Sequence, residues 1–239
     1  MKVTDGFAGN AEKRRLAANR LVELLVAIPL FTSQHHTVFH ADPHAGNLYL
    51  DENTGEMIIF DWALTETLSF EQRRQLFLLM LAVLLRDEQN IYNAIAGLSK
   101  DDLTTDHGKA QIVRRHVAEF IRQLSPFMLA GLSEFSSLLN DLLFAGIQLA
   151  TPILMFRKAL FTLEGVLGDI EPDLQMELVV AQFILKQRMM SIFGNDDPNS
   201  KAVDFALPLS LLDFITLNLS LQTFILRVGM QTVRCGQIS

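Results

Sequence analysis

The sequence predicts a mainly helical domain in which a small β element carries a polar loop. Three observations predict this fold class. The chain has 239 residues, 49% of them hydrophobic, and over most of its length apolar side chains recur at helical spacing. Short runs rich in Val, Leu, Ile and Phe lie between residues 37 and 60, and the polar group His40–Asn47 interrupts them. The length suffices for one domain with a substantial core.

The first elements are expected to be one helix and three short strands. Apolar residues at helical spacing predict the helix over residues 11–31. The strands are expected over Thr37–His40, Asn47–Leu50 and Glu56–Phe60, because these runs are short, apolar and rich in strand-forming side chains. Between the last two strands, residues 51–55 have the composition of a hairpin turn. The strands and their loops would form a β island in a helical chain.

After Asp61 the chain is expected to become helical almost at once. Ser69 and Gln72 form a capping-box pattern, and residues 72–85 are apolar on nearly every side, which predicts a buried helix. His107-Gly108 is interpreted as a break. Further helices are expected over residues 88–98, 112–124, 133–150, 152–167 and 172–193. The last two begin at a proline, which the first turn of a helix tolerates.

The C-terminal part divides into a linker and a last helix. Residues 194–204, rich in Gly, Asn, Asp, Pro and Ser, are expected to link a domain over residues 1–193 to a C-terminal segment over residues 205–239. Residues 205–226 hold one charge, Asp213, but also interleaved polar side chains. This pattern favours an amphipathic, half-buried or membrane-proximal helix over a spanning one.

Bulk properties restrict the compartment and the partners. The net charge of −7 and the pI of about 5.3 argue against nucleic acid as a partner. The single cysteine, Cys235, excludes an intrachain disulfide framework and a cysteine metal site, which favours a reducing compartment. Residues 1–10 lack the apolar core of a signal peptide. We therefore expect a protein on the cytoplasmic side, and the mean hydropathy of +0.25 favours peripheral contact with a membrane.

Two carboxylates and one carboxamide lie close together in the sequence around the β island. They are Asp42, Asn47 and Asp61, the last directly after an apolar strand. Phosphoryl transfer from ATP uses such a set, because one carboxylate orients or deprotonates the acceptor while an Asn and a second Asp hold magnesium. The sequence therefore predicts a kinase-type site. The alternative interpretation is three turn-forming residues beside short strands.

Residues 39–48, Phe-His-Ala-Asp-Pro-His-Ala-Gly-Asn-Leu, resemble the catalytic loop of the UbiB/AarF atypical kinases, the ADCK family in animals. The pattern of that family is F-H-A-D-P-H-P-G-N. The match continues at Ile58–Asp61, where the family has an apolar strand that ends in Asp-Phe-Gly. Residues 2–5, 72–87 and 160–173 also agree with the family, so the resemblance spans about residues 1–190.

The resemblance implies a role for each polar residue of the loop. Asp42 and His40 would be the catalytic pair, with Asp42 as the catalytic aspartate and His40 as the structural histidine before it. Asn47 and Asp61 would bind magnesium, and together with His44, which orders the loop, they would bind ATP. The implied cofactors are Mg²⁺ and ATP.

The chain departs from the family pattern at three places. Ala45 replaces the usual proline, and Trp62-Ala63 replaces Phe-Gly, but neither change removes a ligand. We expect Trp62 to pack inward rather than to stack on adenine. The lysine, glutamate and phosphate-covering loop of a kinase N-terminal lobe have no counterpart in the sequence. The resemblance therefore implies a protein-kinase-like C-terminal lobe only, with the N-terminal lobe absent, and a truncated or split family member that a complementing N-lobe chain would complete.

The spacing after Asp61 bears on the substrate. Seven residues separate Asp61 from Ser69, which leaves no room for the long activation segment of protein kinases. A small molecule, a lipid-like ligand or ATP hydrolysis is therefore favoured over a protein substrate. The resemblance implies an ATP-dependent phosphotransferase or ATPase that supports ubiquinone or other isoprenoid-quinone biosynthesis, with a prenyl-quinone-like lipid as a partner.

Two other functions remain open at this point. The first is a small-molecule phosphotransferase similar to the aminoglycoside and choline kinases, which often have Ile-Asp-Trp where this chain has Asp61-Trp62. The second is a non-catalytic helical scaffold or lipid-binding module. Such a module would bind ATP weakly or not at all.

Overall fold

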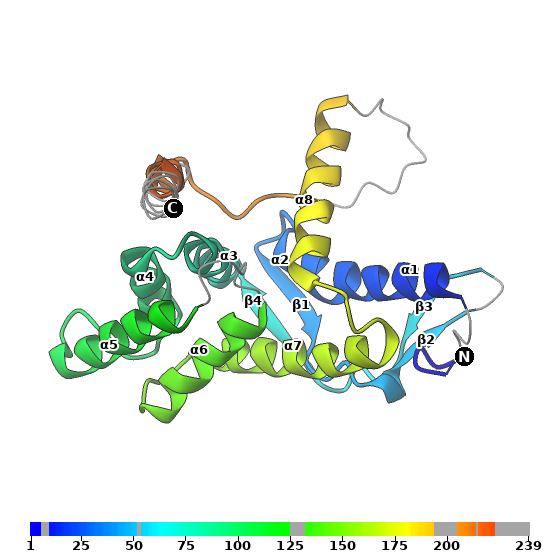
Figure 1. The fold of residues 1–239 in the computed structure, drawn as a ribbon, viewed down its shortest axis with the longest axis horizontal. Helices are drawn as coiled ribbons and strands as arrows, with labels where there is room; N and C mark the ends of the chain where they lie inside the picture. The colour runs from blue at the N-terminus through cyan, green and yellow to red at the C-terminus, as the bar shows by residue number, and fades with distance from the viewer. Residues whose placement is uncertain (6–9, 52–53, 125–131, 194–204, 214, 223–239) are drawn as a thin grey trace, which may run out of the picture.

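The computed structural model of the chain describes residues 1–5, 10–51, 54–124, 132–213 without 194–204, and 215–222 (Figure 1). The described part is mostly helical and contains two small antiparallel sheets, which confirms the predicted fold class at this level. The predicted linker, residues 194–204, lies outside the described residues, as do residues 223–239 of the predicted C-terminal helix.

The N-terminal helical region runs to residue 30. Helix α1 (Ala11–Val22) begins at Asn10, whose side chain accepts a hydrogen bond from the backbone N–H of Lys13. A π-helical turn over Glu23–Ala27 and the short helix α2 (Ile28–Leu30) continue it. The predicted helix over residues 11–31 is therefore right in extent, but one widened turn interrupts its α-helical hydrogen bonding.

The β island consists of two separate antiparallel pairs, of which one joins consecutive strands and the other does not. Strand β1 (His36–His40) pairs antiparallel with β4 (Thr65–Ser69), and His40 lies opposite Thr65. Strand β2 (Leu48–Leu50) pairs antiparallel with β3 (Met57–Ile59). The three predicted strands are confirmed as β1, β2 and β3, with bounds that differ by one residue at some ends.

Strand β4 was not predicted, and the expectation that the chain becomes helical almost directly after Asp61 is wrong. The two threonines of β4 are β-branched and fit a pleated sheet. Leu68 is fully buried, so the strand also contributes to the core. Its pairing partner, β1, lies about 30 residues earlier in the chain, and a pattern within the segment alone does not reveal such a partner.

Six helices follow β4 up to residue 193 in the described residues. They are α3 (Phe70–Leu85), α4 (Glu88–Leu98), α5 (His107–Gln123), α6 (Leu132–Phe144), α7 (Thr151–Ile170) and α8 (Met176–Phe193). Both hydrogen bonds of the predicted capping box at Ser69 and Gln72 are present. His107-Gly108 does not break a helix but begins α5, because the Asp106 side chain caps that helix.

The two predicted first-turn prolines have different outcomes. Pro152 lies in the first turn of α7, as predicted. Pro172 lies in the connection between α7 and α8, because α8 begins only at Met176. The chain leaves α7 after Ile170 and makes a turn before the next helix.

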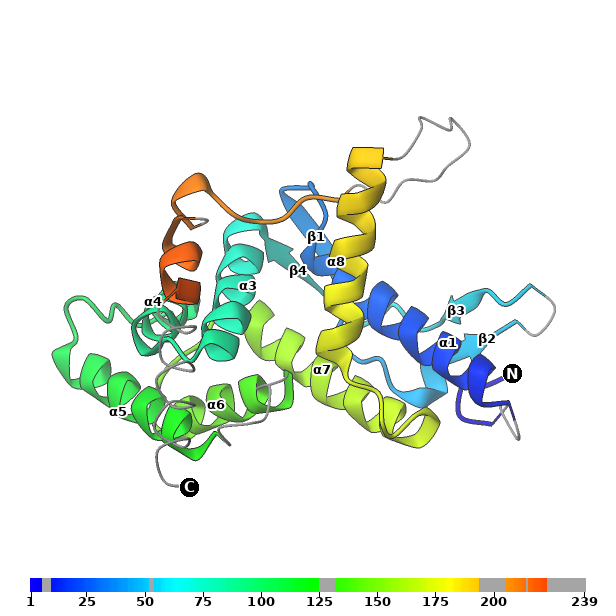
Figure 2. The same ribbon diagram turned by 45° about the horizontal axis from the view of Figure 1, so that its top comes forward.

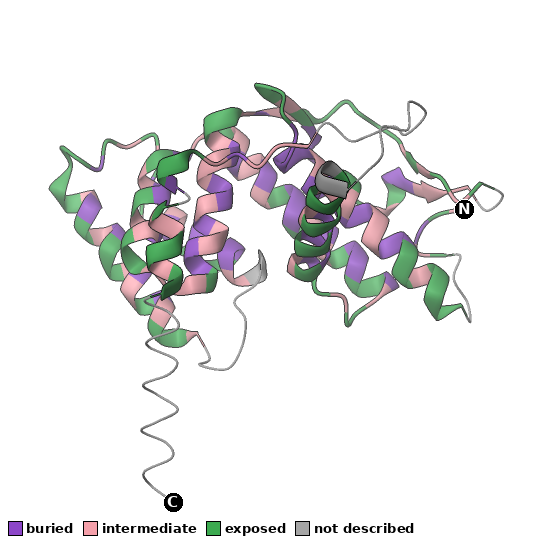
Figure 3. Cartoon of the chain, turned by 90° about the horizontal axis from the view of Figure 1, so that it is seen from above, coloured by how far each residue is buried: buried purple, intermediate pink, exposed green. Residues whose placement is uncertain are grey.

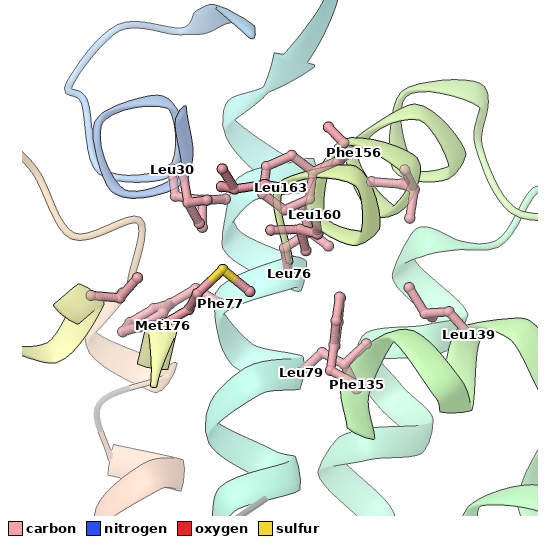
Figure 4. Packing of buried hydrophobic residues seen from close by; sticks show 14 of the residues in the cluster. Leu30, Leu76, Phe77, Leu79, Phe135, Leu139, Phe156, Leu160, Leu163 and Met176 are labelled. Carbon is pink, nitrogen blue, oxygen red and sulfur yellow. The ribbon is translucent and has the colours of Figure 1, made fainter. Parts of the chain in front are cut away.

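The hydrophobic core gathers where α3, α6 and α7 meet α2, the β island and α8 (Figure 4). Leu76 of α3 and Leu160 of α7 point toward one another in the close view, and both are buried. Exposed residues follow the outer surfaces of the helices (Figure 3). The loop between β1 and β2 lies at the edge of this core.

One charged side chain lies within the core. Arg73 of α3 is fully buried and donates hydrogen bonds to the backbone oxygens of Leu30, Thr32 (2.5 Å) and Gln34. A cation at the C-terminal end of a helix interacts favourably with its dipole, and α2 ends at Leu30. Arg73 thus fastens α3 to the chain that enters β1, although the sequence pattern predicts an apolar surface there.

The C-terminal segment, defined here as residues 205–222, lies on α3 and α4 (Figure 2). Phe205 forms an isolated bridge with Thr32, and residues 211–213 and 215–222 are helical. Asp213 accepts hydrogen bonds from Arg74, and Ser220 donates one to Asp87. Among the helices that the structure describes, none has the length and apolar character needed to cross a membrane.

Candidate active site

His40 joins the polar loop to the end of β3. The histidine ends β1 and is 2% exposed. Its Nδ1 accepts the backbone N–H of Asp42 at 3.1 Å, so Nε2 carries the ring proton and donates to the backbone oxygen of Phe60 at 3.1 Å. The neutral imidazole therefore holds the loop on one side and the residue before Asp61 on the other.

The loop after Asp42 folds into a tight turn around His44. The backbone N–H of His44 bonds to the oxygen of Asp42 at 2.9 Å, and residues 45–47 form one 3₁₀ turn. Nδ1 of His44 accepts the N–H of Gly46 at 3.1 Å. A Cβ atom at Gly46 would lie 2.8 Å from Cε1 of His44, so a larger residue at position 46 would displace the His44 ring from this position. The structure thus places His44 within the hydrogen bonds of the loop.

Asn47 is buried and oriented by the same loop. Its side chain Nδ2 donates to the backbone oxygen of Asp42 at 3.3 Å, which leaves the side-chain oxygen as its acceptor or ligand atom. The backbone oxygen of Asn47 accepts the N–H of Phe60 at 2.8 Å. Phe60 is therefore held at its N–H by Asn47 and at its oxygen by His40. These two bonds fix the start of the segment that carries Asp61.

Asp61 has a backbone conformation that L-residues rarely adopt. Its φ is +54°, in the left-handed region that Asp and Asn tolerate better than most residues. The residue is exposed, and one carboxylate oxygen accepts the N–H of Ala63 at 3.4 Å. Strained backbone of this kind is often found at functional sites, and here it turns the chain directly after the predicted metal carboxylate.

The expectation that Trp62 packs inward is wrong in part, because Trp62 is 50% exposed. Its Nε1–H donates to the backbone oxygen of Ile59 at 3.0 Å, and its ring stands edge-on to His40 with centroids 5.2 Å apart. Because the polar N–H finds a partner locally, the ring can lie at the surface beside the loop.

Sequence reasoning missed a lysine that reaches the loop. Nζ of Lys158, on α7, lies 3.4 Å from a carboxylate oxygen of Asp42. In the sequence, Arg157 and Lys158 are the only charged residues between Leu142 and Leu163. That isolated pair of charges was the one available signal, but it did not indicate which face of the helix meets the loop.

The donor set fits magnesium bound together with a nucleotide. Asn47 offers a carboxamide oxygen and Asp61 a carboxylate, which are the hard ligands that Mg²⁺ prefers. Within the described ranges, no group of three or more His, Cys, Asp or Glu side chains is placed to hold a metal. Mg²⁺ commonly takes one or two protein ligands and completes its shell with phosphates and water. The residues present therefore suit a metal shared with ATP.

Comparison with known proteins agrees with the resemblance of the loop. Residues 2–95 match the model of the ABC1 atypical kinase-like domain, and they include all five predicted site residues: His40, Asp42, His44, Asn47 and Asp61. The uncharacterized protein sll1770 of Synechocystis sp. is 26% identical over 178 residues, which cover 73% of this chain and 30% of that protein.

The matched part of the relative is therefore less than a third of its length. No solved structure matches the chain significantly. Lys158 lies outside the part that matches the domain model. Residues 2–95 are thus similar to the ABC1 atypical kinase-like domain.

Proposed function

We propose that the loop and Asp61 bind ATP with Mg²⁺ for phosphoryl transfer or ATP hydrolysis. The observation that carries this proposal is the pair of hydrogen bonds at Phe60. They tie the residue before Asp61 to Asn47 and to His40. Two oxygen ligands and a further carboxylate, Asp42, then belong to one hydrogen-bonded unit, as phosphoryl transfer requires.

Each residue has a defined role in the proposal. Asp42 accepts the proton of the attacking hydroxyl group or water, while Asn47 and Asp61 hold the metal. His40 keeps the loop and the end of β3 together, and His44 shapes the turn between Asp42 and Asn47. When bound, ATP with Mg²⁺ supplies the phosphoryl group.

The proposed acceptor is water or a small, lipid-like molecule. Strand β4 begins four residues after Asp61, so the segment between them is short and partly paired. Following the UbiB resemblance, we extend the proposal to support of isoprenoid-quinone biosynthesis, with a prenyl-quinone-like lipid as partner. Exposed apolar residues of the C-terminal segment support peripheral contact with a membrane on its cytoplasmic side: Leu211, Leu212, Ile215 and Leu219.

The same proposal assigns the parts of the chain. Residues 1–193 correspond to a kinase-like C-terminal lobe, residues 194–204 to a linker and residues 205–239 to a peripheral segment. A chain that supplies the N-terminal lobe is a further proposed partner. Nucleic acid is not among the proposed partners, given the net charge of −7.

Calorimetric titration with ATP, with and without Mg²⁺, tests the proposal on the full chain. Asn tolerates positive φ, so Asp61→Asn removes the metal carboxylate charge without adding strain at φ +54°. We expect Mg²⁺-dependent binding by the wild type and a loss of at least about tenfold in the variant. Asp169→Asn, at an exposed position of α7, is the matched control.

The outcome separates the candidate functions. Binding that needs Mg²⁺ and Asp61 supports the enzyme, and the next question is then the acceptor. A folded wild type that binds no ATP overturns the proposal and favours the non-catalytic scaffold or lipid-binding module.

A further inference from the structure

Helix α7 places a cation, Lys158, beside Asp42 in the loop between β1 and β2. We propose that Lys158 is a γ-phosphate-binding residue of this site, so that the helix α7 completes the phosphate-binding group. The inference rests on the proposed function, because it assumes that ATP binds at the loop. Its starting observation is the 3.4 Å distance between Nζ of Lys158 and a carboxylate oxygen of Asp42.

The backbone of Lys158 is fixed relative to the loop. Phe156, two residues earlier on α7, packs edge-on against Phe39 of β1 with ring centroids 5.4 Å apart. Both rings are buried, and Phe39 directly precedes His40. Since neither backbone can shift without disturbing this contact, the motion left to the ammonium group is that of its own flexible side chain.

The ion pair leaves the ammonium group capacity for another anion. Its 3.4 Å separation exceeds the 2.7–2.9 Å typical of a hydrogen bond between an ammonium and a carboxylate. The side chain of Lys158 is 47% exposed and that of Asp42 is 33% exposed, so the pair adds little to stability. An ammonium has three donors, and it can therefore contact Asp42 and a phosphate oxygen together.

The charges of the site call for such a cation. The site holds two carboxyl side chains, Asp42 and Asp61, and the triphosphate adds several negative charges that one Mg²⁺ balances only in part. Among the ion pairs of the described residues, one involves a predicted site residue, and its cation is Lys158. Electrostatic balance therefore favours Lys158 as a ligand of the nucleotide rather than a mere partner of Asp42.

The position of Asp42 indicates which phosphate is contacted. In phosphoryl transfer the catalytic aspartate contacts the attacking hydroxyl, which lies in line with the γ-phosphorus. A cation beside that aspartate is thus next to the γ-phosphate rather than to the α- or β-phosphate. The consequence is selectivity: Lys158 should strengthen the binding of ATP and leave the binding of ADP nearly unchanged.

Calorimetry with Mg²⁺ and either a non-hydrolysable ATP analogue or ADP tests this selectivity without relying on turnover. Lys158→Met should weaken binding of the ATP analogue by about 10- to 100-fold, the range for a hydrogen bond to a charged group, and leave ADP affinity unchanged. Lys158→Arg keeps the charge and should retain most of the affinity. Lys186→Met, at an exposed lysine of α8, is the matched control.

Each outcome decides the inference. Equal losses for the ATP analogue and ADP, or no loss for either, overturn the role of Lys158 while leaving the proposed function in place. A wild type that binds neither nucleotide overturns the proposed function, and the inference with it. Thermal unfolding of each variant shows that it is folded, and Lys158→Gln replaces Lys158→Met if that variant does not fold.

A double variant gives an independent readout. Asp42→Asn removes a negative charge beside the γ-phosphate, so it should raise affinity for the ATP analogue. Asp42→Asn also frees the ammonium group of Lys158 from its carboxylate partner, so part of the gain depends on Lys158 and should be lost when Lys158→Met is added. A gain of the same size with and without Lys158 contradicts the inference.

Discussion

Two aspartates of this chain each pair with a basic side chain, but the two pairs are built differently. Asp213 binds Nε and Nη2 of Arg74 at 2.7 and 2.6 Å, and its side chain is 8% exposed. Asp42 meets Lys158 at 3.4 Å, with both side chains partly exposed. The first pair fastens the C-terminal segment to α3, whereas the second leaves its carboxylate accessible.

The difference lies in how completely each carboxylate is satisfied. Asp213 also accepts the N–H and the hydroxyl of Ser210, both at 2.7 Å. The Arg74 hydrogen bonds, and then those from Ser210, lower the pKa of Asp213 to about 2 against the opposing effect of burial. A carboxylate whose two oxygens both accept short hydrogen bonds, such as Asp213, holds two parts of the fold together. A carboxylate in a loop with fewer and longer contacts, such as Asp42, can take part in chemistry.

The largest expected effect on stability comes from replacing Arg73, which is a fully buried cation. Arg73→Met removes three hydrogen bonds to the backbone oxygens of Leu30, Thr32 and Gln34. Because the buried oxygens of Leu30 and Thr32 then lose their donor, we expect a loss of about 3 kcal/mol in the free energy of unfolding. Urea unfolding measures it, with Arg115→Met at an exposed site of α5 as control. A loss as small as that of the control would show that the hydrogen bonds of Arg73 to residues 30–34 do not stabilise the fold.

The second largest expected loss of stability comes from breaking the Arg74–Asp213 ion pair. Asp213→Asn removes the less exposed of the two carboxylates that pair with Arg74, since Glu71 remains at 2.8 Å, and it weakens the bonds from Ser210, so we expect a loss of about 2 kcal/mol at neutral pH. Arg74 is itself partly exposed, which limits the loss. The urea midpoints of wild type and variant measure it, and coincident midpoints would contradict the structural role of this pair.

The pH dependence of that loss tests its electrostatic cause. The folded pKa of Asp213, about 2, lies below its ordinary value of 3.8. Its contribution to stability is therefore present above about pH 4 and is lost as the pH falls through about 2. The difference in stability between wild type and Asp213→Asn should shrink over this interval. A difference that stays constant between pH 5 and pH 2 would assign the effect to packing instead.

The exposed pair gives the smallest effect on stability. Asp42→Asn and Lys158→Met should each change the free energy of unfolding by less than about 1 kcal/mol, as partly exposed ion pairs do. Thermal and urea unfolding at neutral pH check both variants. A loss as large as that of Asp213→Asn would mean that the two pairs serve the same structural purpose.

Features set by neighbouring residues could be predicted from the sequence. The capping box at Ser69 and the helix over residues 88–98 were predicted because their signals lie within the segments themselves. The loop motif gave Asp42, Asn47 and Asp61 as candidates, and the structure joins their segments through the backbone of Phe60. The assignment of chemical roles to them stays a prediction.

Features set by distant contacts could not be predicted in this way. Strand β4 depends on pairing with β1, and the burial of Arg73 depends on the backbone oxygens that end α2. Lys158 reaches Asp42 across 116 residues of sequence because Phe156 packs on Phe39. In each example the decisive partner lies far along the chain, where neither periodicity nor local propensity carries information about it.

The most direct test compares three forms of the full chain by titration with ATP in the presence of Mg²⁺. They are the wild type, Asp61→Asn and Asp213→Asn. We expect Asp61→Asn to lose ATP binding while its unfolding transition is unchanged. Asp213→Asn should lose stability but, while folded, bind ATP as the wild type does. ATP binding that survives in Asp61→Asn, or that disappears in folded Asp213→Asn, would contradict the assignment of Asp61 to nucleotide binding and of Asp213 to stability.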